Sequence, residues 1–140
     1  KTAIDAACEW AKANGVKKAM PLNVSAPFHC SLMQPAADAM AEALAGTDIK
    51  SPVVPVVANV SATPVTDPEI IRQNLVAQVT GRVRWTESVQ FMFAQGVDTT
   101  GEVGNGKVLT VMQRRIEKSL KGFTLGAPED LEAFAEAMKG

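Results

Sequence analysis

The stretch "VDTTGEVGNGKVLTVMQRRIEKSLKGFTL", residues 97–125, predicts a strand, a helix and a second strand, one directly after the other. The first strand is expected over 97–103 and ends at a Gly-Asn-Gly turn. The helix is expected from Lys107 to about Lys121, because apolar residues recur there at helical spacing: Val108, Val111, Met112, Ile116 and Leu120. The second strand follows over 122–125. Strand and helix alternate, which favours an α/β fold.

The alternation continues on both sides of this stretch. A strand is expected over 17–24, where Met20, Leu22 and Val24 alternate with other residues. The β-branched run "PVVPVVANV" predicts a largely buried strand over 52–60. Helices are expected over 1–14, 31–45, 66–79, 86–95 and 128–138. The whole chain therefore predicts the α/β class with a mainly parallel sheet.

Two of these helices carry start signals. Asp67 can cap the helix over 66–79, with Pro68 at its first helical position. Ser31 can cap the helix over 31–45, in which Pro35 is tolerable only near the first turn. The second helix should bury one apolar face, made by Leu32, Met33, Ala36, Ala37, Met40 and Leu44.

Composition excludes several classes of function. The 140 residues carry 14 basic and 15 acidic side chains, and no basic run is longer than two residues, so we expect binding to neither nucleic acid nor an anionic membrane. No apolar stretch approaches the roughly 18 residues of a membrane span. Cys8 and Cys30 have no metal-site spacing and indicate a reducing, cytoplasmic location. The chain begins without Met and inside a helix, as a fragment would.

The only histidine, His29, lies in the turn "SAPFHC" between a predicted strand and a predicted helix. Such connections carry the reactive groups of α/β sheets, so His29 is a candidate catalytic base, although a packed structural ring is an alternative. A metal site is poorly supported, because Cys30 is the sole further ligand nearby.

Two other segments have possible functions. "GEVGNGKV", residues 101–108, nearly matches a phosphate-binding loop, but Val108 replaces the hydroxyl residue and Glu102 would repel phosphates. We therefore interpret it as a tight turn, with a nucleotide-binding domain as the weaker alternative. Gln78 lies near the end of a predicted helix, where a free carbonyl oxygen can orient an imidazole. The residues themselves do not link Gln78 to His29.

The order of several blocks is similar to that of a known family. These blocks are "PLNVSAPFHCSLMQPAADAMAEAL" (21–44), "PVVPVVANV" (52–60), "LVAQVTGRVRWTESVQFM" (75–92) and "EVGNGKVLTVMQRRI" (102–116). Over essentially its whole length the chain resembles the carboxyl-terminal half of malonyl-CoA:acyl carrier protein transacylases.

The resemblance implies an S-malonyltransferase of fatty-acid biosynthesis, which moves malonyl from coenzyme A to acyl carrier protein. The family uses a serine in a G-H-S-x-G elbow and a ping-pong covalent mechanism. By resemblance, His29 takes the serine proton and later returns it to a leaving thiol. Gln78 matches the residue whose backbone carbonyl orients that histidine. No cofactor is implied, since the coenzyme A thioester is a substrate.

No G-x-S-x-G occurs in these residues. By resemblance, the nucleophile, the oxyanion-hole amides and the arginine that binds the malonyl carboxylate all precede residue 1. The chain alone is therefore predicted to be inactive, and its expected partners are malonyl-CoA, acyl carrier protein and the missing amino-terminal half of the same protein.

The implied fold has two parts. Residues 25–140 would form the returning half of an α/β-hydrolase-like acyltransferase subdomain, and residues 1–24 the last helix and strand of a ferredoxin-like insertion. An alternative hypothesis stays open at this point, a non-catalytic α/β interaction module in which His29 is structural.

Overall fold

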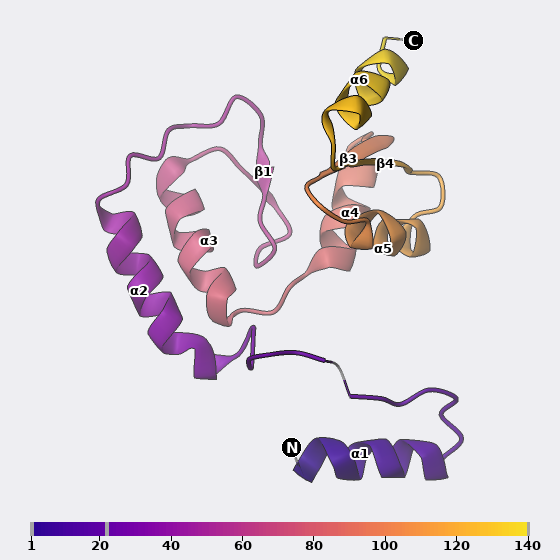
Figure 1. The fold of residues 1–140 in the computed structure, drawn as a ribbon. Coiled ribbons are helices and arrows are strands. Elements are labelled where there is room, and N and C mark those ends of the chain that lie inside the picture. Colours follow the sequence, from indigo (N-terminus) through magenta and orange to yellow (C-terminus); the bar gives the residue numbers. More distant parts are fainter. Residues whose placement is uncertain (1, 22, 140) are drawn as a thin grey trace.

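The computed structural model describes residues 2–21 and 23–139, and Figure 1 shows their arrangement. The elements in chain order are α1 (Thr2–Ala13), the 3-10 helix η1 (Ser31–Met33), α2 (Gln34–Ala45), β1 (Val56–Val57), β2 (Pro64–Val65), α3 (Pro68–Thr80), α4 (Trp85–Ala94), β3 (Thr99–Val103), α5 (Val108–Ile116), β4 (Lys121–Leu125) and α6 (Pro128–Ala137). The α/β class is confirmed. In Figure 1, α1 lies apart from the other elements at the end of an extended segment.

The strand–helix–strand unit predicted over 97–125 is present. β3 and β4 pair in parallel, with Thr99 opposite Lys121 and Val103 opposite Leu125, and α5 connects them. Because side chains alternate along a strand, the two faces of this sheet differ. One face bears Phe123 and Leu125 and packs against α6. The rings of Phe134 on α6 and Phe123 meet edge to face, with their centroids 5.2 Å apart.

The other face of this sheet is polar and receives α5. Thr100 on β3 donates to Gln113 Oε1 at 2.7 Å, and the Glu102 carboxylate accepts from Thr110. Gly122 leaves room for both α5 side chains, because a Cβ there would lie 2.6 Å from Gln113 Nε2 and 2.7 Å from the Thr110 methyl group. Because of these contacts, α5 packs closely against β3 and β4.

The apolar residues whose spacing predicted this helix do not form its buried side, and the helix ends at Ile116 instead of near Lys121. The buried residues of this helix are Thr110 and Gln113, whereas Val108, Val111 and Met112 are exposed. The polar strand face selects the polar side of the helix, which helical periodicity alone does not indicate. Leu120 is buried, but it lies beyond the end of α5.

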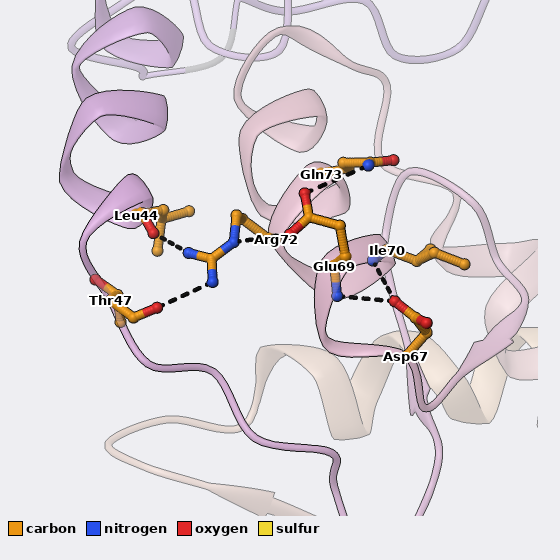
Figure 2. A network of polar contacts seen from close by, with 7 residues as sticks. All are labelled: Leu44, Thr47, Asp67, Glu69, Ile70, Arg72 and Gln73. Carbon is orange, nitrogen blue, oxygen red and sulfur yellow. Dashed lines mark hydrogen bonds and ion pairs between the residues drawn. The ribbon is translucent and has the colours of Figure 1, made fainter.

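The helices α2 and α3 lie side by side and run in opposite directions (Figure 1). Arg72 of α3 ties the pair together at one end (Figure 2). Its guanidinium donates to the carbonyl oxygen of Leu44, in the last turn of α2, and to that of Thr47 at 2.9 Å. It also pairs with the Glu69 carboxylate at 3.2 Å.

The start of α3 is as predicted, and the start of the preceding helix is not. Asp67 caps α3, because its Oδ1 accepts from the amides of Glu69 at 2.8 Å and Ile70 at 3.0 Å (Figure 2). Ser31 is no cap: it opens η1, and α2 begins only at Gln34, with Pro35 in its first turn. Only part of the predicted inner face is covered, since Ala37 is buried while Leu32 and Met40 are exposed.

The predicted strands other than β3 and β4 are largely wrong. The run over 52–60 contributes only β1, whose two residues pair antiparallel with β2. The described residues of 17–24 form no strand, and Leu22 lies outside them. A strand requires a neighbour for its backbone hydrogen bonds, and the described residues offer none at 17–24. In place of the predicted mainly parallel sheet, the described residues form two separate two-stranded sheets, β3–β4 parallel and β1–β2 antiparallel.

Candidate active site

His29 lies in a tightly turned segment just before η1. The amide of Phe28 donates to the carbonyl of Ala26 at 3.0 Å, and the Cys30 thiol donates to the carbonyl of Pro27 at 3.1 Å. His29 itself has a φ of 58°, in the left-handed region that residues with a Cβ rarely adopt. The side chain is exposed, so the ring is reachable from solvent.

The structure brings His29 and Gln78 together across 49 residues of chain. Nδ1 of the ring lies 3.2 Å from the backbone carbonyl oxygen of Gln78. This oxygen has no helical partner, because α3 ends at Thr80 and Gly81 takes an extended conformation, with ψ at 153°. A carbonyl oxygen only accepts, so in the neutral ring the contact favours the tautomer with the proton on Nδ1 and the lone pair on Nε2.

The end of α3 is held by the loop after β1. The amide of Arg84 donates to the carbonyl of Asn59, and its guanidinium donates to the carbonyl of Ser61, both at 2.8 Å. A Cβ at Gly81 would lie 2.9 Å from a methyl group of Val60. The loop therefore fixes where α3 ends, and with it the Gln78 carbonyl.

A small cavity adjoins Gln78 on the side of the β1–β2 hairpin. Aliphatic side chains line most of it, and besides Gln78 itself the polar lining residues are Asn59 and Asn74. The Asn74 Nδ2 is buried with no hydrogen-bond partner in the described part of the chain. Sequence reasoning did not find Arg84, because the carbonyls that it bonds are distant in sequence, or the two amides, because only the fold places them beside Gln78.

The segment "GEVGNGKV" does not leave the amino terminus of α5 open for a phosphate group. The Glu102 carboxylate occupies the amino terminus of α5, accepting from the amides of Leu109 at 3.2 Å and Thr110 at 2.8 Å and from the Thr110 hydroxyl at 2.7 Å. These bonds, led by that from the Thr110 amide, lower the pKa of Glu102. A phosphate would need these same amides, and the Glu102 carboxylate already occupies them. The nucleotide-binding alternative therefore has no support.

Metal and membrane features are absent from the residues described. No three residues among His, Cys, Asp and Glu come together there as a metal site, and both Cys8 and Cys30 are free thiols. Within 2–21 and 23–139, no helix combines the length and the apolar character that a bilayer crossing demands.

Comparisons with known proteins give one consistent result. The chain is 47% identical over 133 residues to a malonyl CoA-acyl carrier protein transacylase of Salmonella typhimurium, a match covering 95% of this chain and 43% of that protein. It is 46% identical over 136 residues to the protein of the same name from Escherichia coli K12, covering 97% and 44%. The chain thus spans less than half the length of the curated relatives it matches. No family model matches it.

Solved structures agree with these sequence matches. An acyl-carrier-protein-S-malonyltransferase from Bartonella henselae superposes with a TM-score of 0.90 at 49% identity, covering 99% of this chain and 44% of that one. A malonyl-transacylase in complex with a type II polyketide acyl-carrier protein gives a TM-score of 0.87 at 42% identity, and the match covers 98% of this chain and 44% of that one. Almost every residue of the present chain therefore has a counterpart in such enzymes.

Proposed function

This chain is homologous to the carboxyl-terminal half of malonyl CoA-acyl carrier protein transacylases, and from that premise we propose that it supplies the catalytic base of such an enzyme. The whole protein would move malonyl from coenzyme A to the phosphopantetheine thiol of an acyl carrier protein, for fatty-acid biosynthesis. The observation that carries the proposal is the 3.2 Å contact between His29 Nδ1 and the Gln78 carbonyl oxygen.

The proton on Nδ1 gives His29 the form that a general base needs. With Nδ1–H donating to the carbonyl, the Nε2 lone pair can take the proton of a serine hydroxyl as its oxygen attacks the thioester carbon. When the carbon–sulfur bond breaks, the imidazolium gives that proton to the departing thiolate of coenzyme A, which leaves as the thiol. In the second half-reaction the carrier protein's thiol loses its proton to Nε2 and attacks the acyl-serine, and the serine oxygen recovers the proton.

A backbone carbonyl replaces the carboxylate of a usual triad in this scheme. The carbonyl fixes the tautomer and the ring orientation without adding a negative charge beside the imidazolium. Every residue has such a carbonyl, so the side chain at Gln78 should contribute little to the reaction. What should matter is where α3 ends.

The serine, the oxyanion-hole amides and the malonate-binding arginine belong, in this proposal, to a part of the protein that precedes Lys1. We propose that residues 25–140 belong to an α/β-hydrolase-like subdomain and residues 1–24 to a ferredoxin-like insertion. The separation of α1 from the other elements supports a boundary near residue 24 (Figure 1). We also propose a cytoplasmic location and a reaction without a cofactor, with acyl carrier protein and the amino-terminal half as partners.

The test uses the complete protein that carries this sequence. If His29 is the base, His29→Ala and His29→Asn should both slow acylation by malonyl-CoA by about 10²- to 10⁴-fold. Gln78→Ala, the matched control, should stay close to the parent rate. The rate of acyl-enzyme formation and the melting temperature are measured on the same samples. A destabilised His29 variant with normal acylation per folded molecule would make the histidine structural and sink the proposal.

A further inference from the structure

We propose that Arg72 is a positioning residue for His29, which it holds against the Gln78 carbonyl by fixing α2 on α3. This inference rests on the proposed function for its catalytic meaning, but its geometric content stands by itself. It concerns a residue that contacts neither His29 nor any reacting group.

Hydrogen bonds connect α2 and α3, or the segments next to them, at both ends of the helix pair. At one end the Arg72 guanidinium bonds the carbonyl oxygens of Leu44 and Thr47, at and just beyond the last turn of α2 (Figure 2). At the other end the His29 ring bonds the carbonyl of Gln78, in the last turn of α3. Each contact uses carbonyls at or just beyond a helix terminus, and that of Leu44 also accepts from the amide of Thr47 at 3.1 Å.

His29 is carried by α2. Only Cys30 separates it from η1, and the last residue of η1 is followed directly by Gln34, the first residue of α2. η1 also packs against α3. A movement of the amino-terminal end of α2 relative to α3 would therefore change the distance between His29 and Gln78.

The length of α2 makes the distance between His29 and Gln78 sensitive to the contacts of Arg72 at the other end of the helix. The twelve residues of α2 span about 18 Å, so a rotation of about 10° around the helix midpoint moves each end by roughly 1.5 Å. A hydrogen bond is lost when the distance between its heavy atoms exceeds about 3.5 Å. The His29–Gln78 contact begins at 3.2 Å, so even a small rotation would break it.

Arg72 differs from an ordinary surface cation. Its side chain is only 23% exposed, whereas that of Lys50, in a surface ion pair with Asp48, is 85% exposed. Its planar fork reaches two carbonyls of one helix end while Nε holds Glu69 of its own helix. A positive charge at the carboxyl end of α2 is also favourable for the helix dipole. The contact is specific in geometry as well as in charge.

The experiment measures the ¹⁵N NMR signals of the His29 ring in the complete protein that carries this sequence, where the signals that His29→Asn lacks identify this ring. In the unaltered protein we expect the tautomer with the proton on Nδ1. Arg72→Met keeps the aliphatic stem but loses every donor, and should bring the two ring-nitrogen shifts closer together as both tautomers become populated. Arg72→Lys should give an intermediate result, because one ammonium cannot reproduce the fork. Lys50→Met, which removes the same charge near the same end of α2, should leave the ring signals unchanged.

Each outcome decides the proposal. Folded Arg72→Met with the ring signals of the unaltered chain would overturn it, as would equal shifts in Lys50→Met. If circular dichroism shows that Arg72→Met has unfolded, Arg72→Lys decides, and unaltered ring signals in that variant overturn the proposal.

The same substitutions in the complete protein separate this proposal from the proposed function. If both hold, Arg72→Met lowers kcat by about 10- to 100-fold with little change in KM, as expected for a misplaced catalytic group. A changed tautomer in Arg72→Met with normal acylation in His29→Asn would leave the positioning intact and refute the catalytic role.

Discussion

At the scale of single residues, the backbone of His29 has a consequence for stability that is separate from its ring. A left-handed conformation costs a residue with a Cβ about 1–2 kcal/mol, and asparagine tolerates it better than alanine. We expect His29→Asn to be more stable than His29→Ala by about 0.5–1 kcal/mol, measured by urea unfolding. At Glu42, exposed on α2, the order should reverse, because alanine is the better helix former. A more stable alanine variant at position 29 would show that the φ of 58° carries no strain.

The site was predictable only in part at this scale. The turn position singled out His29, and only the family resemblance pointed to Gln78 as its partner, since Gln78 lies 49 positions further along the chain. The left-handed φ was not predicted, because histidine adopts it more often than most residues but still only in a small minority of cases. Arg72 was also missed, since its partners Leu44 and Thr47 lie 28 and 25 residues away. Such contacts follow from how the helices pack, which local patterns do not contain.

At the scale of elements, α5 owes its amino terminus to a side chain on another element. Lys107 precedes the helix and gives it no side-chain cap, so Glu102 on β3 satisfies the free amides instead. The same cross-element bonding explains why the buried side of α5 could not be predicted from its periodicity. By contrast, α3 carries its own cap in Asp67, and its start was predictable from sequence.

The Glu102 cap should make stability depend on pH. In the folded chain its pKa lies below the ordinary value of 4.5, so below that value the unfolded state takes up a proton that the folded state does not. The stabilisation is therefore complete above about pH 4.5 and is lost as the pH falls through the lowered pKa. We expect the melting temperature of the unaltered chain to exceed that of Glu102→Gln near neutral pH, and the difference to shrink on acidification.

Glu117→Gln is the matched control for this pH series, because the Ser119 hydroxyl lowers the pKa of Glu117 in a turn outside the helix. In both variants the melting temperature should depend less on pH in the acid range. Only Glu102→Gln should also reduce the circular dichroism signal from the helix α5. A gap between the unaltered chain and Glu102→Gln that stays constant from about pH 6 to about pH 3 would contradict the assignment.

At the scale of the whole molecule, many apolar side chains have no cover. Among the most exposed are Leu32, Val53, Val54, Val103 and Val108. Unpaired strand edges and apolar surface of this kind favour association. We predict that the 140-residue chain associates with itself, or with the amino-terminal half of the complete protein when both are present. Sedimentation showing a monomer that unfolds cooperatively across a wide concentration range would count against this prediction.

The isolated chain should also fail to transfer malonyl from coenzyme A. A base without its nucleophile leaves no group to form the acyl-enzyme, and no G-x-S-x-G occurs in these residues. The assay measures malonyl-CoA turnover with purified chain and acyl carrier protein, and the complete protein serves as the positive control. Turnover at a rate comparable to that control would refute both the prediction and the assignment of the nucleophile.

The glycine at position 122 limits which inherited changes this protein can tolerate. Thr110 and Gln113, which fill the space above it, are buried and held in place by hydrogen bonds to β3, so neither can withdraw cheaply from an added Cβ. Every missense mutation of a glycine codon adds a Cβ, so we expect every such mutation at this codon to destabilise the packing of α5 on the strands. Among natural sequence variants, codon 122 should therefore show synonymous changes almost exclusively, while the neighbouring exposed codon for Lys121 drifts freely.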